Sequence, residues 1–191
     1  MAVSARREHL IDTALDLFAE RGYHATGIDT ILGRAGISKK TLYRHFRSKD
    51  ELILAALKKY DGLFRNNFMR QVEARADDPR DRLLAIYDVA GDWFAQDDFF
   101  GCIYINATGE FSAPGTPIRK ACQEFKAMLR DFIECLCEQA GASDPVTLAA
   151  ELAIVLEGAI VTAQIAQDGG KAAKVAKSAA AALVDKAIPR A

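Results

Sequence analysis

Basic side chains suited to binding an anion crowd into one short segment near the N-terminus, residues 39–46. Leu42 and Phe46 stand one helical turn apart, and if both face inward the polar residues of the segment lie on or beside the outer face. Those outward residues are Lys39, Lys40, Tyr43 and Arg44. Lys and Arg side chains donate hydrogen bonds to guanine O6 and N7, so this face suits the groove of a nucleic acid.

The elements that must position this face are two short helices joined by a turn that contains glycine. Thr26 is the expected N-cap of the first helix, which ends at Gly36. Ser38 is the expected N-cap of the second helix, which runs to about His45. This spacing is that of a helix-turn-helix, in which the second helix enters the major groove and the first braces it. Two short helices and a turn also occur in ordinary bundles, where the basic face is merely solvated.

Helical signals recur along the whole chain, and no stretch shows sustained alternation of apolar and polar residues. The capping box Ser48-Lys-Asp-Glu51 opens a long helix, and Pro79 suits the start of the next one. We therefore predict an all-α chain of about nine helices. The expected ranges are 5–21, 26–36, 38–45, 48 to beyond 70, 79–96, 101–111, 117–139, 145–167 and 171–188.

Composition places the chain among globular proteins and divides its charge unevenly. Charged residues make up 27% and hydrophobic residues 50% of the 191 positions, enough for one substantial core. The net charge of −1 by itself predicts no polyanion partner. Residues 1–50, however, hold nine Lys and Arg against six Asp and Glu, while residues 51–191 hold sixteen against twenty. A mildly basic head on an acidic body is compatible with a head that binds nucleic acid.

Several classes of protein are not expected. The N-terminus lacks the apolar run of a signal peptide, and Glu151 and Glu157 interrupt the apolar stretch 146–166, which is expected to be a buried helix. We therefore expect a cytoplasmic chain with no membrane partner. The cysteines are expected to be reduced thiols without metal-ligand spacing, and they are Cys102, Cys122, Cys135 and Cys137. Without a phosphate loop, a nucleophile elbow or a histidine cluster, we expect no metal, no cofactor, no catalytic residue and no enzymatic activity.

Several residues within positions 8–55 match a known family at fixed spacing. They comprise Phe18-Ala-Glu-Arg-Gly-Tyr23, Thr26, Ile31, Ala35-Gly-Ile-Ser38, Thr41-Leu-Tyr43-Arg-His-Phe46 and Ser48-Lys-Asp-Glu-Leu52. This segment closely resembles the tetracycline-repressor (TetR) family of transcriptional regulators. Leu32 stands where many members have Ala, and Lys40 where many have Gly or Ala. Neither departure affects the expected fold, but Lys40 bears on which bases are read.

The resemblance implies a homodimeric regulator with a helix-turn-helix DNA-binding domain at 1–47 and an effector-binding and dimerisation domain at 48–191. It implies a ligand-responsive repressor that binds a palindromic operator in double-stranded DNA as a dimer. A small apolar or aromatic effector would release that dimer. The alternatives are a transcriptional activator, or a helical ligand-binding or interaction module without DNA-binding activity.

The matched positions also imply which residues contact DNA. The implied readers of base edges are Lys39, Lys40 and Thr41, with Arg44 beside them. The implied phosphate contacts are Thr26, Ser38, Tyr43, His45 and Lys49. For Tyr43 and His45 the alternative is partial packing against the first helix, and for Lys49 it is a free surface lysine.

The region 93–111 concentrates aromatic side chains, which suit either a cavity for an apolar ligand or an ordinary helical core. The resemblance implies the cavity. Cys102, Asn106 and Glu110 follow one another at intervals of four and share one helical face, where the last two could instead brace neighbouring helices. The expected effector-binding residues are Trp93, Phe94, Phe100, Cys102, Tyr104, Asn106, Glu110, Phe111, Phe125, Glu157 and Gln164. Of these, Glu157 is expected to face either the pocket or the dimer interface.

The last two helices are expected to form the dimer interface. The helix at 145–167 is apolar nearly all round, which implies burial on more than one side. In the family that the chain resembles, the final pair of helices forms a four-helix interface with the two-fold related copy. The implied interface residues are Leu152, Leu156, Ile160, Ala163, Val175, Ala179 and Leu183.

Overall fold

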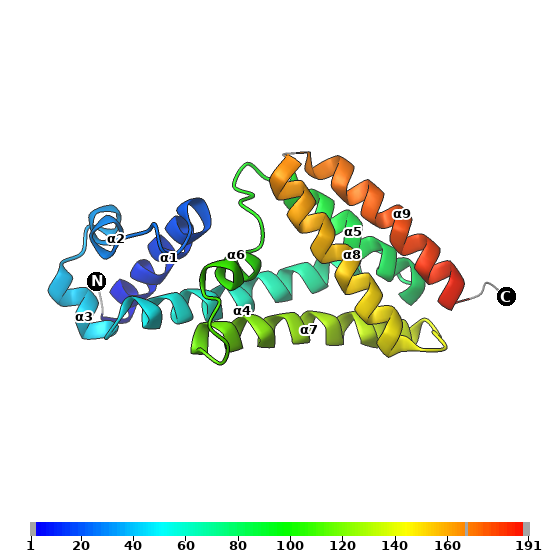
Figure 1. Cartoon of the computed structure of the whole chain (residues 1–191), viewed down its shortest axis with the longest axis horizontal. Coiled ribbons are helices and arrows are strands. Elements are labelled where there is room, and N and C mark those ends of the chain that lie inside the picture. The colour runs from blue at the N-terminus through cyan, green and yellow to red at the C-terminus, as the bar shows by residue number, and fades with distance from the viewer. Residues whose placement is uncertain (1–2, 167, 189–191) are drawn as a thin grey trace. The chain divides into compact units, whose positions relative to one another are not determined.

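The computed structural model describes residues 3–166 and 168–188, and in these ranges the chain forms nine α-helices and no strand (Figure 1). The prediction of an all-α chain is therefore confirmed. Met1, Ala2, Gln167 and residues 189–191 lie outside the described residues, and so does the expected helix end at 167. By its packing the chain divides into unit 1, Met1–Leu63 with Ile103–Phe125, and unit 2, Phe64–Cys102 with Lys126–Ala191.

The first three helices of unit 1 share one small core. They are α1 (Val3–Arg21), α2 (Ile28–Ala35) and α3 (Lys39–His45), and each contacts the other two. Leu10, Phe18, Ile31 and Leu42 are each at most 1% exposed, so every one of these helices contributes to the core. Helices of eight and seven residues are too short to persist alone in water, and burial of these side chains stabilises them.

The turn between α2 and α3 has the caps that the sequence predicts. Gly36 follows α2 in the left-handed conformation, with φ at 63°. Ser38 opens α3, and its Oγ accepts a hydrogen bond from Thr41 N at 3.3 Å. The start of α2 differs from the prediction, because its N-cap is Gly27 and no side chain caps the helix. Thr26, the expected N-cap, turns its hydroxyl toward α1 instead.

Helix α4 (Lys49–Arg75) begins with a shifted form of the expected capping box. Ser48 Oγ accepts a hydrogen bond from Glu51 N at 3.2 Å, while Glu51 Oε2 accepts one from Arg47 N at 2.7 Å. In the usual box the acidic side chain reaches the N–H of the N-cap residue, so here that bond is displaced by one residue. The helix continues past residue 70, as expected, and contributes its first part to unit 1 and its last part to unit 2.

Two later segments complete unit 1: helix α6 (Ile103–Glu110) and the first part of α7 (Pro117–Gln139). Tyr104 is 1% exposed, donates its hydroxyl hydrogen to Leu57 O at 2.8 Å, and stacks on Phe125 with 3.8 Å between ring centroids. Helix α6 therefore packs against the first part of α4 and the first part of α7. The division by packing thus does not follow the expected boundary between residues 47 and 48.

Unit 2 is built around three helices that lie side by side (Figure 1). They are α5 (Pro79–Phe94), α8 (Pro145–Ala166) and α9 (Gly169–Ala187). Small residues let α5 and α9 approach closely, since a Cβ on Gly91 would lie 3.0 Å from Ala173 Cβ. At the start of α9 a Cβ on Gly169 would lie 2.9 Å from the backbone oxygen of Phe94, so that position requires glycine.

Tyr87 joins α5 to α8 within the core of unit 2. Its side chain is 1% exposed, and its hydroxyl donates a hydrogen bond to Leu152 O at 2.8 Å. Burial, with a smaller contribution from Cys137, raises the pKa of Tyr87 well above its ordinary value. The hydroxyl therefore stays protonated and keeps donating this bond throughout the ordinary pH range.

Helix α8 is, within the described ranges, the one helix long and apolar enough to cross a membrane by length and composition. In the structure one side of α8 is buried against α5 and α9, as in the core helix of a bundle. The expectation of no membrane partner stays a prediction.

We expect Tyr87→Phe to lower the free energy of unfolding by about 1 kcal/mol, because the variant keeps the ring and loses only one buried hydrogen bond. Chemical denaturation followed by circular dichroism measures this change. Tyr43→Phe is the matched control, since Tyr43 is 49% exposed and its change should fall within about 0.5 kcal/mol of zero. Equal stability of the two variants would show that the buried hydroxyl of Tyr87 contributes nothing.

Candidate nucleic-acid interface

The outer face of α3 is a basic surface whose orientation is set by the buried side of the same helix. Leu42 is fully buried and Phe46, just after the helix, is 3% exposed, which confirms that both face inward. The expected outward residues are all exposed, and they are Lys39, Lys40, Tyr43 and Arg44. Their contacts with bases or phosphates stay predictions.

The start of α3 is engaged in local contacts. The hydroxyls of Ser38 and Thr41 lie 3.0 Å apart, and Ser38 also caps the helix. Lys39 Nζ lies 3.5 Å from Asp29 Oδ1 on α2, with both side chains more than half exposed. An exposed pair of this kind is worth little in water, so Lys39 is available to a stronger anion such as phosphate.

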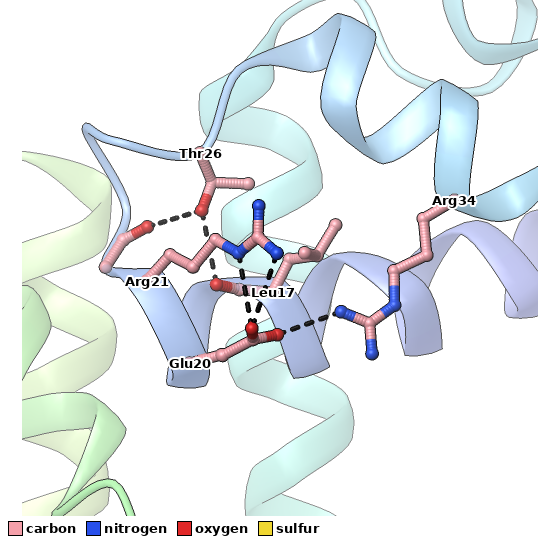
Figure 2. A network of polar contacts seen from close by, with 6 residues as sticks. Leu17, Glu20, Arg21, Thr26 and Arg34 are labelled. Atoms are coloured by element: carbon pink, nitrogen blue, oxygen red, sulfur yellow. Dashed lines mark hydrogen bonds and ion pairs between the residues drawn. The ribbon is translucent and has the colours of Figure 1, made fainter.

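Thr26 does not have the role expected for it. Its side chain is fully buried, and its Oγ1 lies 2.7 Å from Gly22 O and 3.2 Å from Leu17 O, as Figure 2 shows. The expected phosphate contact is therefore wrong for this side chain, because the hydroxyl is enclosed and already donates within the protein. Its actual contacts tie the segment after α1 to the last turn of that helix.

Glu20, near the end of α1, contacts its neighbour Arg21 and also Arg34 in the last turn of α2 (Figure 2). Its Oε2 lies 2.9 Å from Arg34 Nη1, and its Oε1 lies 3.3 Å from Arg21 Nε. The hydrogen bond from Arg34 is the main cause that holds the pKa of Glu20 below its ordinary value. Desolvation opposes this shift, and the nearby Arg21 adds to it. Glu20 stands fourteen residues from Arg34, and no helical spacing signals such a contact.

Contacts within the protein limit how His45 and Lys49 could bind a phosphate. The His45 ring is half-buried, and its Nε2 is buried without a hydrogen-bond partner, so only Nδ1 remains for a phosphate. Lys49 Nζ lies 3.5 Å from His24 O, close to the limit for a hydrogen bond. Both phosphate contacts stay predictions.

The expected effector residues fall into two groups, one in each unit. In unit 1, Tyr104 stacks on Phe125, while Phe111 packs against the ring of His24 with 4.8 Å between centroids. Glu110, also in unit 1, accepts hydrogen bonds from the backbone N–H groups of Tyr23 and His24. Glu110 thus holds the segment after α1, and its contact with an effector stays a prediction. Asn106, on the same helix, is half-buried.

The group in unit 2 is aromatic at its centre. Trp93 meets Phe64 edge to face at 4.9 Å and Phe99 at 5.1 Å, and Phe94 lies 5.1 Å from Phe99. Phe100 is 40% exposed, and its backbone oxygen accepts a hydrogen bond from Gln164 Nε2 at 3.0 Å. Cys102, at the end of this segment, is buried.

Glu157 pairs with a lysine on the neighbouring helix of unit 2. Its Oε1 lies 3.3 Å from Nζ of Lys126 on α7, and that nitrogen is buried. The carboxylate, 46% exposed, thus compensates a charge that would otherwise be costly to bury. Whether an effector or a second copy also meets Glu157 stays open.

The expected dimer residues of α8 lie on the wrong side of that helix. Leu152, Leu156, Ile160 and Ala163 are at most 4% exposed within the single chain, so they form its core and cannot meet a partner. The opposite side of α8 carries the exposed apolar residues Ile154, 71% exposed, and Ile165, 78% exposed. The prediction failed because α8 is apolar nearly all round and its periodicity does not separate the two sides.

Helix α9 presents the residues that were expected on it. Val175 is 63% exposed, Ala179 is exposed, and Leu183 is half-buried. A groove of about 540 Å³ runs between the exposed sides of α8 and α9, with Gly158, Thr162 and Val175 in its lining. A second chain stays a predicted occupant of this groove. No group of three or more His, Cys, Asp or Glu side chains that could hold a metal ion occurs within the described part of the chain.

Two sequence families match successive parts of the chain. The family described as bacterial regulatory proteins, tetR family, matches residues 10–56. The family described as tetracyclin repressor-like, C-terminal domain, matches residues 79–179, which is more than half of the chain. The first match contains α2, α3 and the exposed basic residues, and the second contains α5, α8 and the first part of α9.

Individual relatives support these matches. The HTH-type transcriptional activator FasR of Mycolicibacterium smegmatis is 43% identical over 93 residues, which cover 48% of this chain and 42% of FasR. The HTH-type transcriptional repressor NemR of Escherichia coli K12 is 28% identical over 116 residues, 60% of this chain and 58% of NemR. The matched part thus spans about half the length of these curated relatives. A solved TetR-type transcriptional regulator from Streptomyces avermitilis is 32% identical, with a TM-score of 0.83 over 95% of this chain and 97% of its own.

We expect Thr26→Val to lower the free energy of unfolding by about 1–2 kcal/mol, because it keeps the shape of the side chain and removes a buried donor from two carbonyls. Thr30→Val is the matched control, since Thr30 is exposed on α2 and its change should stay within about 0.5 kcal/mol. Thermal and chemical denaturation measure both. A Thr26→Val protein of unchanged stability that binds DNA more weakly would restore the phosphate contact rejected above.

Proposed function

Because the chain belongs to the tetracycline-repressor (TetR) family of bacterial regulators, we propose that it controls transcription by binding operator DNA as a homodimer. The observation that carries this proposal is the outer face of α3. Lys39, Lys40 and Arg44 are exposed there on a helix that Leu42 and Phe46 hold in place. Such a helix fits the major groove, where Lys and Arg reach guanine edges and phosphates.

The proposed activity is repression, and binding of an effector would release the protein from the operator. A dimer seated on an operator excludes other proteins from that DNA, and NemR, which is named a repressor, supports this direction. Activation is the second candidate, because FasR, named an activator, is 43% identical over its matched part. Transcription in vitro from a promoter that carries the selected operator distinguishes the two candidates. A repressor lowers the amount of transcript, and an activator raises it.

A small apolar or aromatic molecule is the proposed effector. The aromatic group of unit 2, formed by Phe64, Trp93, Phe94 and Phe99, offers ring faces and edges that bind such a molecule well. An ordinary core is the alternative for the same rings. We further propose that the protein works in the cytoplasm and that its role is regulatory rather than enzymatic.

The proposed dimer uses the exposed sides of α8 and α9. On α8 the residues Ile154, Gly158 and Ile165 follow helical spacing and form one stripe, and Val175 of α9 lines the adjoining groove. Apolar side chains exposed to this extent on a single chain are typical of an interface. A two-fold axis through this face gives the dimer two copies of α3, which suit half-sites about one turn of DNA apart, roughly 34–36 Å.

We expect Lys40→Ala and Lys49→Ala to weaken DNA binding in different ways. Loss of a phosphate contact at Lys49 should weaken binding to all sequences alike and reduce the salt slope by about one unit. Loss of a base contact at Lys40 should relax preference at particular base pairs, by about 1–3 kcal/mol for a good bidentate contact. The probe is a duplex selected by the wild-type protein from a random-sequence pool, beside a scrambled duplex. Identical effects of both variants on both duplexes would show that Lys40 contacts only the phosphate backbone of the DNA.

We expect Ile154→Glu to convert the dimer to a monomer, because a carboxylate would be desolvated at the centre of the proposed interface. Leu63→Glu is the matched control, since Leu63 is 62% exposed on another long helix, α4, outside the proposed interface. Light scattering coupled to size-exclusion chromatography measures the mass, and circular dichroism checks that both variants fold. A dimer that survives Ile154→Glu unchanged would place the interface elsewhere.

A further inference from the structure

Glu110, the last residue of α6, holds the loop between α1 and α2 with both oxygens of its carboxylate. Its Oε1 accepts a hydrogen bond from Tyr23 N at 2.7 Å, and its Oε2 accepts one from His24 N at 2.6 Å. The same Oε2 lies 2.9 Å from Nδ1 of the His24 ring. Hydrogen bonds to an ionised carboxylate are shorter and stronger than those between neutral groups. This contact is therefore the strongest polar link between α6 and the loop.

Other contacts of α6 place it firmly against the same loop. The hydroxyl of Tyr23 donates to Ile103 O, in the first turn of α6, at 2.9 Å. Phe111, just after α6, stacks on His24. The positive φ of Gly22, +85°, favours glycine at this position, and a Cβ there would lie 2.9 Å from Glu110 Oε1 and displace the carboxylate. The loop is thus shaped to receive the carboxylate.

The carboxylate is charged at neutral pH. Partial burial raises the pKa of Glu110, but hydrogen bonds from the backbone of His24 and Tyr23, together with the His24 ring, outweigh it and lower the pKa below its ordinary value. The contact is accordingly present at neutral pH and is lost as the pH falls through that lowered pKa.

The opposite side of the loop faces a residue that is proposed to touch DNA. His24 O lies 3.5 Å from Lys49 Nζ at the start of α4, and Thr26 anchors the far end of the loop to α1. The loop therefore lies between a carboxylate of α6 and a cation of the proposed phosphate-binding set. A displacement of α6 that moved residues 22–24 would also move the carbonyl that faces Lys49.

We propose that Glu110 is a positioning residue of the DNA-binding head: through Tyr23 and His24 it sets the place of the loop, and through that loop the place of Lys49 at the operator. The proposal rests on the proposed function, since it requires that the head bind DNA. The proposal implies that a structural change elsewhere in unit 1, if it displaces α6, also changes the affinity for the operator. A purely local brace for the fold is the competing explanation.

The decisive variant is Glu110→Gln, which removes the charge and one of the two acceptor oxygens and keeps the size of the side chain. We expect its affinity for the selected operator duplex to fall about tenfold, in line with the loss of one hydrogen bond to a charged group. Removing a negative charge near DNA should by itself strengthen binding, so a weaker complex points to positioning. Asp16→Asn is the matched control, an exposed carboxylate on α1 that makes the same charge change. It should leave the affinity unchanged or slightly raised.

Further readouts separate positioning from a brace. Affinity for the scrambled duplex should fall by a similar factor in Glu110→Gln, because Lys49 is proposed to contact phosphate and so serves all sequences alike. In the Lys49→Ala background, Glu110→Gln should cost no further affinity. The backbone amide resonances of Tyr23 and His24 should shift and their hydrogen exchange should accelerate, while the melting temperature stays within a few degrees of wild type. A fall in melting temperature, or an equal loss of affinity from Glu110→Gln in the wild-type and Lys49→Ala backgrounds, would instead establish the brace and overturn the proposal.

The remaining outcomes are also informative. If the two amides are released and operator affinity matches that of Asp16→Asn, Glu110 does not position the head. If the wild-type chain selects no duplex at all, the proposed function fails, and the amide resonances of Glu110→Gln still report whether the contact exists. Failure of the proposed function and failure of the role of Glu110 are therefore distinguished by whether wild-type protein binds the selected duplex.

Discussion

Burial of Leu42 and Phe46 is the constraint on which the proposed DNA-binding surface depends. A helix of seven residues cannot hold its conformation or its direction alone in water, because nucleating a helix costs more than a few hydrogen bonds return. With Leu42 fully buried and Phe46 nearly so, the rotation of α3 about its axis is set. Lys39, Lys40 and their neighbours then face outward as a geometric consequence. Recognition and folding of the head therefore rest on the same two side chains.

Polar contacts do for the loop 22–26 what apolar burial does for α3. The loop holds a left-handed glycine and two backbone N–H groups that take part in no bond within a helix, so these groups need other partners. The hydroxyl of Thr26 supplies one anchor from within the head, and the carboxylate of Glu110 supplies another from α6. The loop is therefore fixed both by its own contact with α1 and by a carboxylate of α6.

The core of unit 2 rests on helices whose apolar surface exceeds what one chain buries. Helix α8 covers α5 and α9 with one side and exposes Ile154 and Ile165 on the other. The exposed isoleucines of α8, together with the groove between α8 and α9 that Val175 lines, are why a second chain is the proposed occupant. The surplus of apolar surface is thus the physical basis of the proposed homodimer.

The sequence by itself determined the all-α class, the start of nearly every helix and the outward face of α3. These features follow from local rules: Ser38 and Gly36 cap adjoining helices through bonds within a few residues, and the spacing of Leu42 and Phe46 sets one face. Only the tertiary structure decided that Thr26 is buried, that Glu110 bonds to the backbone of Tyr23 and His24, and that Leu152 and its neighbours form the core. Contacts such as Glu110 with His24 span 86 residues, and no periodicity encodes them. An apolar helix such as α8 leaves its inward side undefined until its neighbours are in place, because burial depends on what packs against it.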